Sequence, residues 1–228
     1  MKSLVLFSGG LDSSVCLALA VSRFGAEDVI ALSVYYGQKH KKEMDASEKV
    51  AAYYGVKRRT LDLGEIFKGS SCSLLEGSEI EIPNEDYSTQ LSETGGSPVN
   101  TYVPFRNGLF ISSAASIALS CGCKYIYYGA HADDAAGNAY PDTSEPFNKA
   151  ISDAVWIGSG NALEVIAPFI HKSKADVVAE GLRLGVPFEL TWSCYAGREK
   201  ACGCCGTCRD RLRAFAVNHV SDPIEYEQ

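Results

Sequence analysis

The sequence is poor in proline and lacks any long hydrophobic run. It has 8 Pro in 228 residues, 46% hydrophobic and 21% charged residues, a composition that excludes collagen-like and disordered chains. The apolar stretch near the N-terminus ends at Ser8-Gly9-Gly10 and is therefore too short for a signal peptide or a membrane span. No later apolar stretch reaches membrane length. We therefore expect a cytoplasmic globular protein with no membrane partner.

Positive charge is also scarce. Lys and Arg total 21 against 28 Asp and Glu, which gives a formal net charge of -7. A net acidic chain lacks the broad basic surface with which proteins bind duplex nucleic acid or tRNA tightly. The charge balance favours a small-molecule ligand and argues against direct contact with nucleic acid.

Short apolar runs alternate with segments of helical periodicity. The runs predict strands at residues 4–7, 29–36, 56–63, 125–128 and 165–167. Between them, helical spacing predicts helices around residues 15–21, 41–54, 109–119 and 147–157, and a capping-box pattern at Ser173 opens a further helix that ends at Gly185. This alternation predicts an α/β fold with a mainly parallel, Rossmann-like sheet covered by helices on both faces.

Residues 67–101 break the alternation. They are rich in Ser, Gly, Glu and Asn and show little periodicity. Irregular segments of this length inside compact domains are usually functional flaps or disordered stretches. We expect a mobile loop near the active site.

A loop rich in glycine and serine follows the first predicted strand. Residues 8–14 are Ser-Gly-Gly-Leu-Asp-Ser-Ser, placed at the carboxyl end of the strand, where open α/β sheets bind ligands. Two glycines leave the backbone amides accessible, while the helix N-terminus and three hydroxyls supply donors for an anion. The loop matches neither G-x-x-x-x-G-K-[ST] nor G-x-G-x-x-G. It predicts a phosphate site in which Asp12 either caps the helix or helps to place Mg²⁺.

The 9 cysteines fall into two groups. Four are scattered, whereas five lie close together near the C-terminus: Cys194, Cys202, Cys204, Cys205 and Cys208. In a reducing compartment such a cluster indicates a metal site rather than disulfides. Cys202, Cys205 and Cys208 have C-x-x-C-x-x-C spacing, and Cys194 completes a closed shell of four thiolates, which favours one structural Zn²⁺ over its main alternative, an iron–sulfur cluster. Cys204 falls outside this register.

Other polar residues have simpler interpretations. Arg209, Arg211 and Arg213 are expected on a solvated helix face. Single histidines such as His131, with no partner visible in the sequence, are more often surface or core residues than proton shuttles.

The Ser-Gly-Gly loop resembles the pyrophosphate loop of the ATP pyrophosphatase superfamily. The resemblance implies that the loop binds the β,γ-phosphates of ATP while a substrate oxygen attacks the α-phosphate, which releases pyrophosphate and leaves an adenylate. The implied ATP-binding residues are Phe7, Ser8, Gly9, Gly10, Leu11, Asp12, Ser13, Ser14 and Val15.

Further motifs resemble the 7-cyano-7-deazaguanine synthase family of the queuosine pathway over nearly the whole chain. They lie at residues 36–40, 103–107, 129–134, 140–142, 173–176, 184–187 and 190–195. Two departures fall in segments expected near the acceptor substrate. Phe105 stands where the family usually has Gly, and Thr143-Ser144-Glu145 stands where it commonly has Cys-Arg-Pro-Glu.

This second resemblance implies a ligase that forms carbon–nitrogen bonds. Its substrates would be 7-carboxy-7-deazaguanine, ammonia and ATP with Mg²⁺. Adenylation replaces oxide by AMP as the leaving group, so ammonia can give an amide, and a second activation of the amide oxygen permits loss to the nitrile. Lys174 and Arg106 are the cations expected to stabilise charge at the α-phosphate. The family also implies a homodimer.

We expect residues 1–190 to form the ATP-binding domain and residues 191–228 a small zinc-binding segment with a helix. Two alternative functions stay open. A tRNA thiolation enzyme would use the same loop with an RNA surface and a catalytic cysteine, for which Cys121 and Cys123 are the candidates. A nucleotide-binding regulatory module would bind ATP without turnover.

Overall fold

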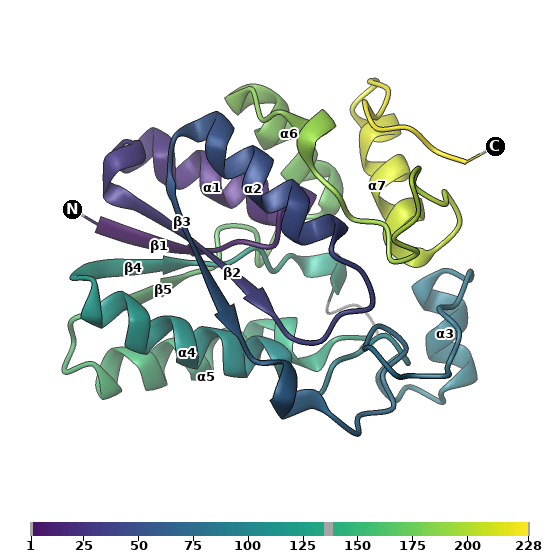
Figure 1. The fold of residues 1–228 in the computed structure, drawn as a ribbon, viewed down its shortest axis with the longest axis horizontal. Helices are drawn as coiled ribbons and strands as arrows, with labels where there is room; N and C mark the ends of the chain where they lie inside the picture. Colours follow the sequence, from purple (N-terminus) through teal and green to yellow (C-terminus); the bar gives the residue numbers. More distant parts are fainter. Residues whose placement is uncertain (1, 135–138, 228) are drawn as a thin grey trace.

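The computed structural model describes residues 2–134 and 139–227. In this part of the chain five parallel strands form one sheet in the order β3-β2-β1-β4-β5 (Figure 1). The winding direction reverses at β1, so the carboxyl ends of β1 and β4 meet at the switch point where open α/β sheets bind ligands. The strands are β1 (Lys2–Leu6), β2 (Val29–Tyr35), β3 (Lys57–Asp62), β4 (Cys123–Tyr127) and β5 (Glu164–Ile166).

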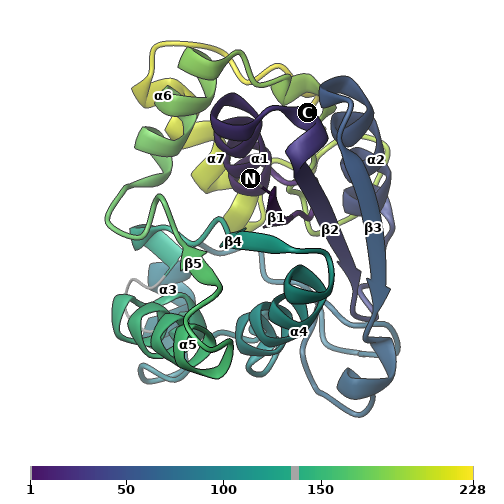
Figure 2. The same cartoon turned by 90° about the vertical axis from the view of Figure 1, so that its left-hand side faces the viewer.

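Helices cover both faces of this sheet (Figures 1 and 2), which confirms the predicted fold class. On one face lie α1 (Leu11–Phe24), α2 (Lys42–Tyr54) and α6 (Lys174–Leu184), and on the other α4 (Arg106–Ser120) and α5 (Glu145–Gly158). Helix α7 (Gly206–Val217) packs against α6. Short 3-10 turns lie at Ala26–Asp28, Gly64–Phe67, Pro141–Thr143 and Phe188–Leu190. None of the described helices is long and apolar enough to cross a membrane.

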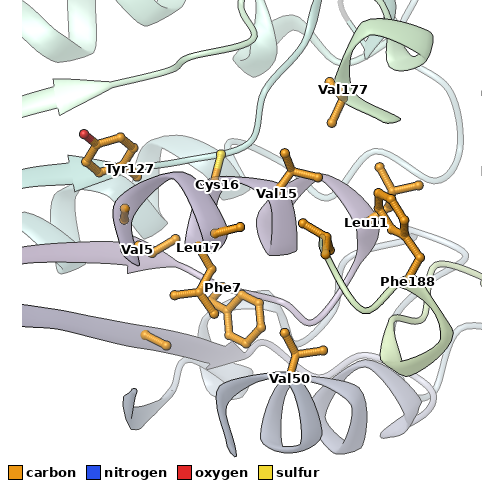
Figure 3. Packing of buried hydrophobic residues seen from close by; sticks show 14 of the residues in the cluster. Val5, Phe7, Leu11, Val15, Cys16, Leu17, Val50, Tyr127, Val177 and Phe188 are labelled. Carbon is orange, nitrogen blue, oxygen red and sulfur yellow. The ribbon is translucent and has the colours of Figure 1, made fainter. Parts of the chain in front are cut away.

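The central strand β1 contributes to a separate apolar core on each face of the sheet. Val5 belongs to the core that also contains Leu17 of α1 and Val177 of α6 (Figure 3), whereas Leu4 belongs to the core under α4 and α5. Successive strand side chains point to opposite faces, so a central strand must be apolar at consecutive positions. Each such fully buried side chain contributes about 1.5–3 kcal/mol.

The start of α6 confirms the predicted capping box. Ser173 Oγ accepts a hydrogen bond from the Asp176 backbone amide at 3.2 Å, and the Ser173 amide donates to Asp176 Oδ2 at 2.8 Å. Gly185 ends the helix with φ 67°, in the left-handed region that glycine adopts without strain. The cap fixes Lys174 as the first residue of the helix.

Residues 67–101 contain a helix that the sequence pattern did not predict. Helix α3 (Tyr87–Glu93) begins at Asp86, whose Oδ1 accepts a hydrogen bond from the Thr89 amide at 2.9 Å. A helix of seven residues spans only two turns, too few to produce a visible period. The expected mobility of the segment stays a prediction.

Candidate active site

A cavity of about 250 Å³ opens at the carboxyl ends of β1, β2 and β4. Its walls come from the loop after β1, the segment after β2, residues 129–134 after β4, the first turns of α4 and α6, and the C-terminal segment. The family-like motifs scattered along the sequence therefore meet in one place. Leu74 and Tyr87 also line the cavity, which puts part of residues 67–101 at the site as expected.

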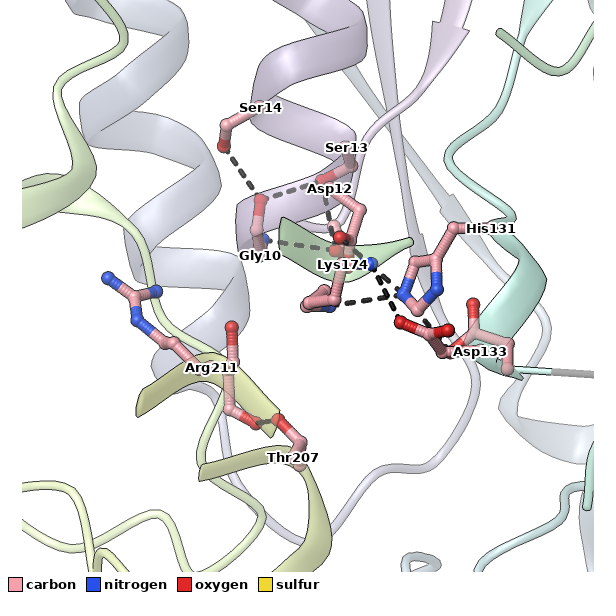
Figure 4. Close-up of polar contacts among 12 residues, drawn as sticks. Gly10, Asp12, Ser13, Ser14, His131, Asp133, Lys174, Thr207 and Arg211 are labelled. Atoms are coloured by element: carbon pink, nitrogen blue, oxygen red, sulfur yellow. Dashed lines mark hydrogen bonds and ion pairs between the residues drawn. The ribbon is translucent and has the colours of Figure 1, made fainter. Parts of the chain in front are cut away.

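The Ser-Gly-Gly loop is braced by its own hydroxyls (Figure 4). Ser8 Oγ accepts a hydrogen bond from the Gly10 amide at 3.1 Å, and Ser14 Oγ donates to the Gly10 carbonyl at 2.8 Å. Gly9 has φ +88°, and a Cβ there would lie 2.4 Å from the Ser47 amide nitrogen, so glycine is required where the loop meets α2.

The predicted ATP-binding residues divide by position. Phe7, Ser8, Gly10, Asp12 and Ser13 line the cavity. The remaining four are buried and are not among its lining residues: Gly9, Leu11, Ser14 and Val15.

Lys174 lies at the centre of a charged network facing the loop. Its Nζ is 2.5 Å from Asp12 Oδ2 and 3.3 Å from His131 Nε2, and its backbone amide donates to Asp133 Oδ2 at 2.7 Å. His131 Nε2 is also 3.3 Å from Asp134 Oδ1. Burial lowers the pKa of Lys174, but the two carboxylates Asp12 and Asp134 raise it more, so the ammonium stays charged.

Arg106 is the second predicted catalytic cation and lines the same cavity. Its Nη1 donates to the Tyr36 hydroxyl at 3.2 Å, and its guanidinium carbon lies 5.2 Å from the centroid of that ring. Among the described residues no carboxylate forms an ion pair with it. Asp142 holds the start of α4 in place, since it accepts hydrogen bonds from the Asn107 amide at 2.8 Å and from Asn107 Nδ2 at 3.2 Å. Arg106 is thus fixed with its charge available to an anion.

The two departures from the family pattern differ in their position relative to the cavity. Thr143 lines the cavity, as expected, but Phe105 does not. Phe105 is 58% exposed, precedes α4 with φ 54°, and its ring packs edge-on against Phe147 at a centroid distance of 5.9 Å. Its neighbours Arg106 and Asn107 do line the cavity, so the segment reaches the cavity although the Phe105 ring does not. A glycine at this position would adopt the left-handed conformation without strain.

Three tyrosines form one wall of the cavity. The hydroxyl of Tyr87 lies 3.2 Å from that of Tyr195 and 3.3 Å from that of Tyr140, and Tyr140 also contacts Tyr195 at 3.3 Å and Thr101 Oγ1 at 2.7 Å. Sequence reasoning missed this cluster because its members are far apart in the chain and share no local motif.

Four of the five C-terminal cysteines form the expected cluster. The ligand atoms of Cys194, Cys202, Cys205 and Cys208 all lie within 4.8 Å of one another. Zinc–sulfur bonds of about 2.3 Å place tetrahedral sulfurs roughly 3.8 Å apart, and Cys202 Sγ is 4.0 Å from Cys208 Sγ. Backbone amides also donate to these sulfurs, as for Cys202 N to Cys194 Sγ at 3.3 Å. The donor set fits a four-coordinate metal ion.

The fifth cysteine is separate from the cluster. Cys204 Sγ donates to Asn84 Oδ1 at 3.2 Å instead. Its exclusion from the set agrees with its position outside the C-x-x-C register.

The cysteine cluster is joined to the cavity by the segment between them. Trp192 donates its backbone amide to the Gly9 carbonyl at 3.0 Å, and Thr207 Oγ1 donates to the Ser193 carbonyl at 2.9 Å. Ser193, Tyr195 and Thr207 all line the cavity. A metal ion on the cysteines would therefore stabilise one wall of the site.

The expectation of a solvated arginine face on α7 was wrong for Arg211. Arg209 and Arg213 are exposed, but Arg211 is 1% exposed and its Nε lies 2.6 Å from Asp222 Oδ2. Its Nη1 also donates to Thr191 Oγ1 at 2.7 Å. Residues 208, 211 and 215 share one helix face, so the residue between Cys208 and Phe215 is buried with them.

Several ionisable groups at the cavity had no role assigned from the sequence. Glu43, Asp134 and Asp210 line it, and His131 lies behind Asp134 and Lys174. The motif that contains His131 and Asp134 directly follows β4, and that position was a usable signal. Glu43 and Asp210 gave no such signal, because they lie on helices that approach the cavity only through tertiary packing.

Comparison with known proteins agrees with this geometry. Residues 2–219 match the family model described as queuosine biosynthesis protein QueC. A 7-cyano-7-deazaguanine synthase of Pseudoalteromonas atlantica is 39% identical over 99% of both chains, and one of Thermoplasma acidophilum is 45% identical over 100% of this chain and 92% of the relative. The solved NMN synthetase of Francisella tularensis has a similar fold (TM-score 0.52, 15% identity, 88% of this chain and 69% of that one). The chain belongs to the queuosine biosynthesis protein QueC family.

Proposed function

We propose that the protein converts 7-carboxy-7-deazaguanine and ammonia into 7-cyano-7-deazaguanine at the expense of ATP, through an adenylated carboxylate and an amide. Family membership supports this activity, and so does one structural observation. The Ser-Gly-Gly loop, Lys174 and Arg106 line a single cavity at the switch point of the sheet. An anion-binding loop beside two fixed cations suits the attack of a carboxylate on an α-phosphate.

Each cation has a distinct place in this proposal. Lys174 is held against the loop by Asp12, so its ammonium is preorganised for charge that develops at the α-phosphate. Arg106 has no carboxylate partner among the described residues, and its planar guanidinium suits a carboxylate or phosphate oxygen. The cavity-lining loop residues would hold the β,γ-phosphates.

Mg²⁺ would accompany ATP. Asp12, Asp134 and Asp210 line the cavity with the oxygen ligands that Mg²⁺ prefers, and Asp12 Oδ1 has no hydrogen-bond partner in the described structure. These residues fit the ion, which would neutralise phosphate charge when bound.

We assign the four cysteines to one structural Zn²⁺. A closed shell of four thiolates leaves no position for a substrate, and the cluster lies beside the cavity wall rather than in it. We likewise propose that residues 1–190 form the ATP-binding domain and residues 191–228 the zinc-binding segment.

The assembly and compartment are part of the same proposal. A homodimer is supported by apolar side chains exposed near the ends of the adjacent helices α4 and α5, namely Leu119, Trp156 and Ile157. A cytoplasmic location suits both thiolate ligands and ATP as a co-substrate.

The tRNA thiolation alternative has little structural support. Cys121 and Cys123 lie at the amino end of β4, the opposite end of the strand from the cavity. Cys123 is 4% exposed, and Cys121 accepts a hydrogen bond from Arg59 Nη1 at 3.0 Å. RNA binding at low salt together with activity that depends on either cysteine would restore this alternative.

The decisive experiment uses purified protein with Mg·ATP, ammonium and 7-carboxy-7-deazaguanine. AMP, pyrophosphate and the mass of the deazapurine are followed together. A nitrile product with AMP is the expected result. AMP and pyrophosphate without the nitrile would indicate another acceptor, with Thr143 as the first residue to examine, and no turnover with any acceptor would indicate a nucleotide-binding module.

A further inference from the structure

Glu43 has a carboxylate that lines the cavity and to which the proposed reaction assigns no role. It is the second residue of α2 and lines the cavity beside the Ser-Gly-Gly loop. The first turn of α2 is clamped to this loop, because a Cβ on Gly9 would lie 2.5 Å from the Glu43 carbonyl oxygen. Glu43 Oε1 lies 3.9 Å from the position that a Cβ on Gly10 would occupy. The carboxylate is therefore held at the edge of the expected phosphate site.

No described residue neutralises this carboxylate directly. Its side chain forms no hydrogen bond or ion pair within residues 2–134 and 139–227, whereas Asp12 and Asp134 are already engaged by Lys174 and His131. The titratable and charged groups that line the cavity with it lie on several elements. They are Asp12 on α1, Tyr36 and His40 after β2, Arg106 on α4, Asp134 after β4, Lys174 on α6, Asp210 on α7, and the tyrosines Tyr87, Tyr128, Tyr140 and Tyr195. Burial raises the pKa of Glu43 from 4.5 to about 7, and the charge of Arg106 lowers it in part.

The proposed reaction needs a group with these properties. Ammonia is present at neutral pH almost entirely as ammonium, which has no lone pair with which to attack an acyl adenylate. A partly buried carboxylate attracts a cation, and a base that titrates near the working pH transfers protons most effectively. Neither Lys174 nor Arg106 can accept a proton in its charged form.

We propose that Glu43 binds ammonium in the cavity and takes one proton from it, which makes it the base for carbon–nitrogen bond formation. The freed lone pair attacks the acyl carbon of the adenylate. The C–N bond forms as the bond from carbon to the phosphate oxygen breaks, and AMP leaves with that electron pair. The second proton that the nitrogen sheds passes to the AMP phosphate, and Glu43 returns its own proton to water. This inference rests on the proposed function and adds its nitrogen-binding step.

The test separates adenylation from amide formation in Glu43→Gln, with Glu48→Gln, an exposed position of the same helix, as the matched control. Adenylation is measured as carboxylate-dependent ATP–pyrophosphate exchange without ammonia. We expect exchange to stay within about threefold of wild type in both variants. Product formation from ammonium at pH 7 should fall about 100-fold or more in Glu43→Gln alone, the size of effect typical of a lost general base.

A pH profile and a second nucleophile distinguish a base from a structural residue. In wild type the kcat/KM for total ammonium should level off above about pH 7.5. In Glu43→Gln it should keep rising about tenfold per pH unit, because only free ammonia can then react. Hydroxylamine, which is largely unprotonated at pH 7, should react at nearly equal rates with both proteins.

The outcomes are distinguishable. Exchange retained with unchanged use of ammonium, or exchange lost together with product formation, would overturn the role of Glu43. Equal slowing with hydroxylamine and ammonium would overturn it as well. Absence of carboxylate-dependent exchange in the wild type would instead overturn the proposed function itself.

Discussion

Lys174 Nζ lies 2.5 Å from Asp12 Oδ2, and this ion pair joins the first turn of α6 to the first turn of α1. The two residues are 162 positions apart in the sequence, and the ion pair holds them together beside the Ser-Gly-Gly loop. Lys174 and Asp12 have side chains only 13% and 24% exposed, so solvent screens the pair weakly. The capping box of Ser173 and Asp176 fixes the first turn of α6, and it therefore helps to hold the Lys174 ammonium against the loop.

Replacing Lys174 by Met should abolish most adenylation. The methionine keeps the hydrophobic stem but removes the charge that faces the α-phosphate, and we expect ATP–pyrophosphate exchange to fall about 100-fold or more. Lys172→Met, at an exposed position just before the helix, is the control and should keep wild-type exchange. Unchanged exchange in the Lys174 variant, with the fold intact by circular dichroism, would remove this residue from the mechanism.

Replacing Cys205 by Ala should cost metal and stability before it alters chemistry. Metal binding and folding are coupled at four-thiolate sites, and a loss of about 3 kcal/mol would lower Tm by roughly 6–12 °C in a chain of this size. Cys204→Ala is the control, because Cys204 lies outside the cluster. We expect one zinc per chain by elemental analysis in wild type and in the control. Full thermal stability of a metal-free Cys205→Ala protein, or bound iron with sulfide, would contradict the assignment.

The sequence predicted those parts of the structure that depend on neighbouring residues. Three features were identified from residues close together in the chain: the strand, loop and helix around residues 4–21, the capping box at Ser173 and the cysteine spacing. The sequence therefore placed the Ser-Gly-Gly loop at the carboxyl end of β1 and grouped the four cysteines that the structure brings together.

The remaining features depend on tertiary packing. The hydroxyl cluster of Tyr87, Tyr140 and Tyr195 unites three segments that no pattern connects. Arg211 is buried only because its helix face also carries Cys208 and Phe215, and its partner Asp222 lies beyond the end of the helix. In the sequence, Glu43 cannot be distinguished from any other acidic residue in the first turn of a helix, because only tertiary packing brings α2 against the Ser-Gly-Gly loop.

Phe105 provides a backbone test that is independent of function. Its φ of 54° strains any side chain with a Cβ by about 1–2 kcal/mol. Glycine removes this strain but also removes the ring contact with Phe147, worth about 0.5–1.5 kcal/mol. We therefore expect Phe105→Gly to be nearly as stable as wild type, and Phe105→Ala to be about 1 kcal/mol less stable than Phe105→Gly in urea unfolding. Because Phe105 does not line the cavity, kcat/KM should not change in either variant. An alanine variant as stable as the glycine variant would show that the backbone there is unstrained.

Glu43 should make the protein less stable at alkaline than at acidic pH. Its pKa is about 7 in the folded protein against 4.5 unfolded, so the fold binds the proton more tightly than the unfolded chain does. The stability associated with that proton is fully present below pH 4.5 and is lost as the pH rises to 7, by up to about 3 kcal/mol at about 1.4 kcal/mol per pH unit. Burial of the ionised carboxylate is the cause.

Glu43→Gln removes this ionisation while it preserves the shape of the side chain. We expect the variant to melt several degrees higher than wild type at pH 8 and at nearly the same temperature at pH 5, as measured by calorimetry at both pH values. Glu48→Gln should show no such pH-dependent difference, because its side chain is exposed. A Glu43→Gln effect of equal size at pH 5 and pH 8 would mean that the carboxylate is not penalised by burial, and would place its titration near that of an ordinary surface glutamate.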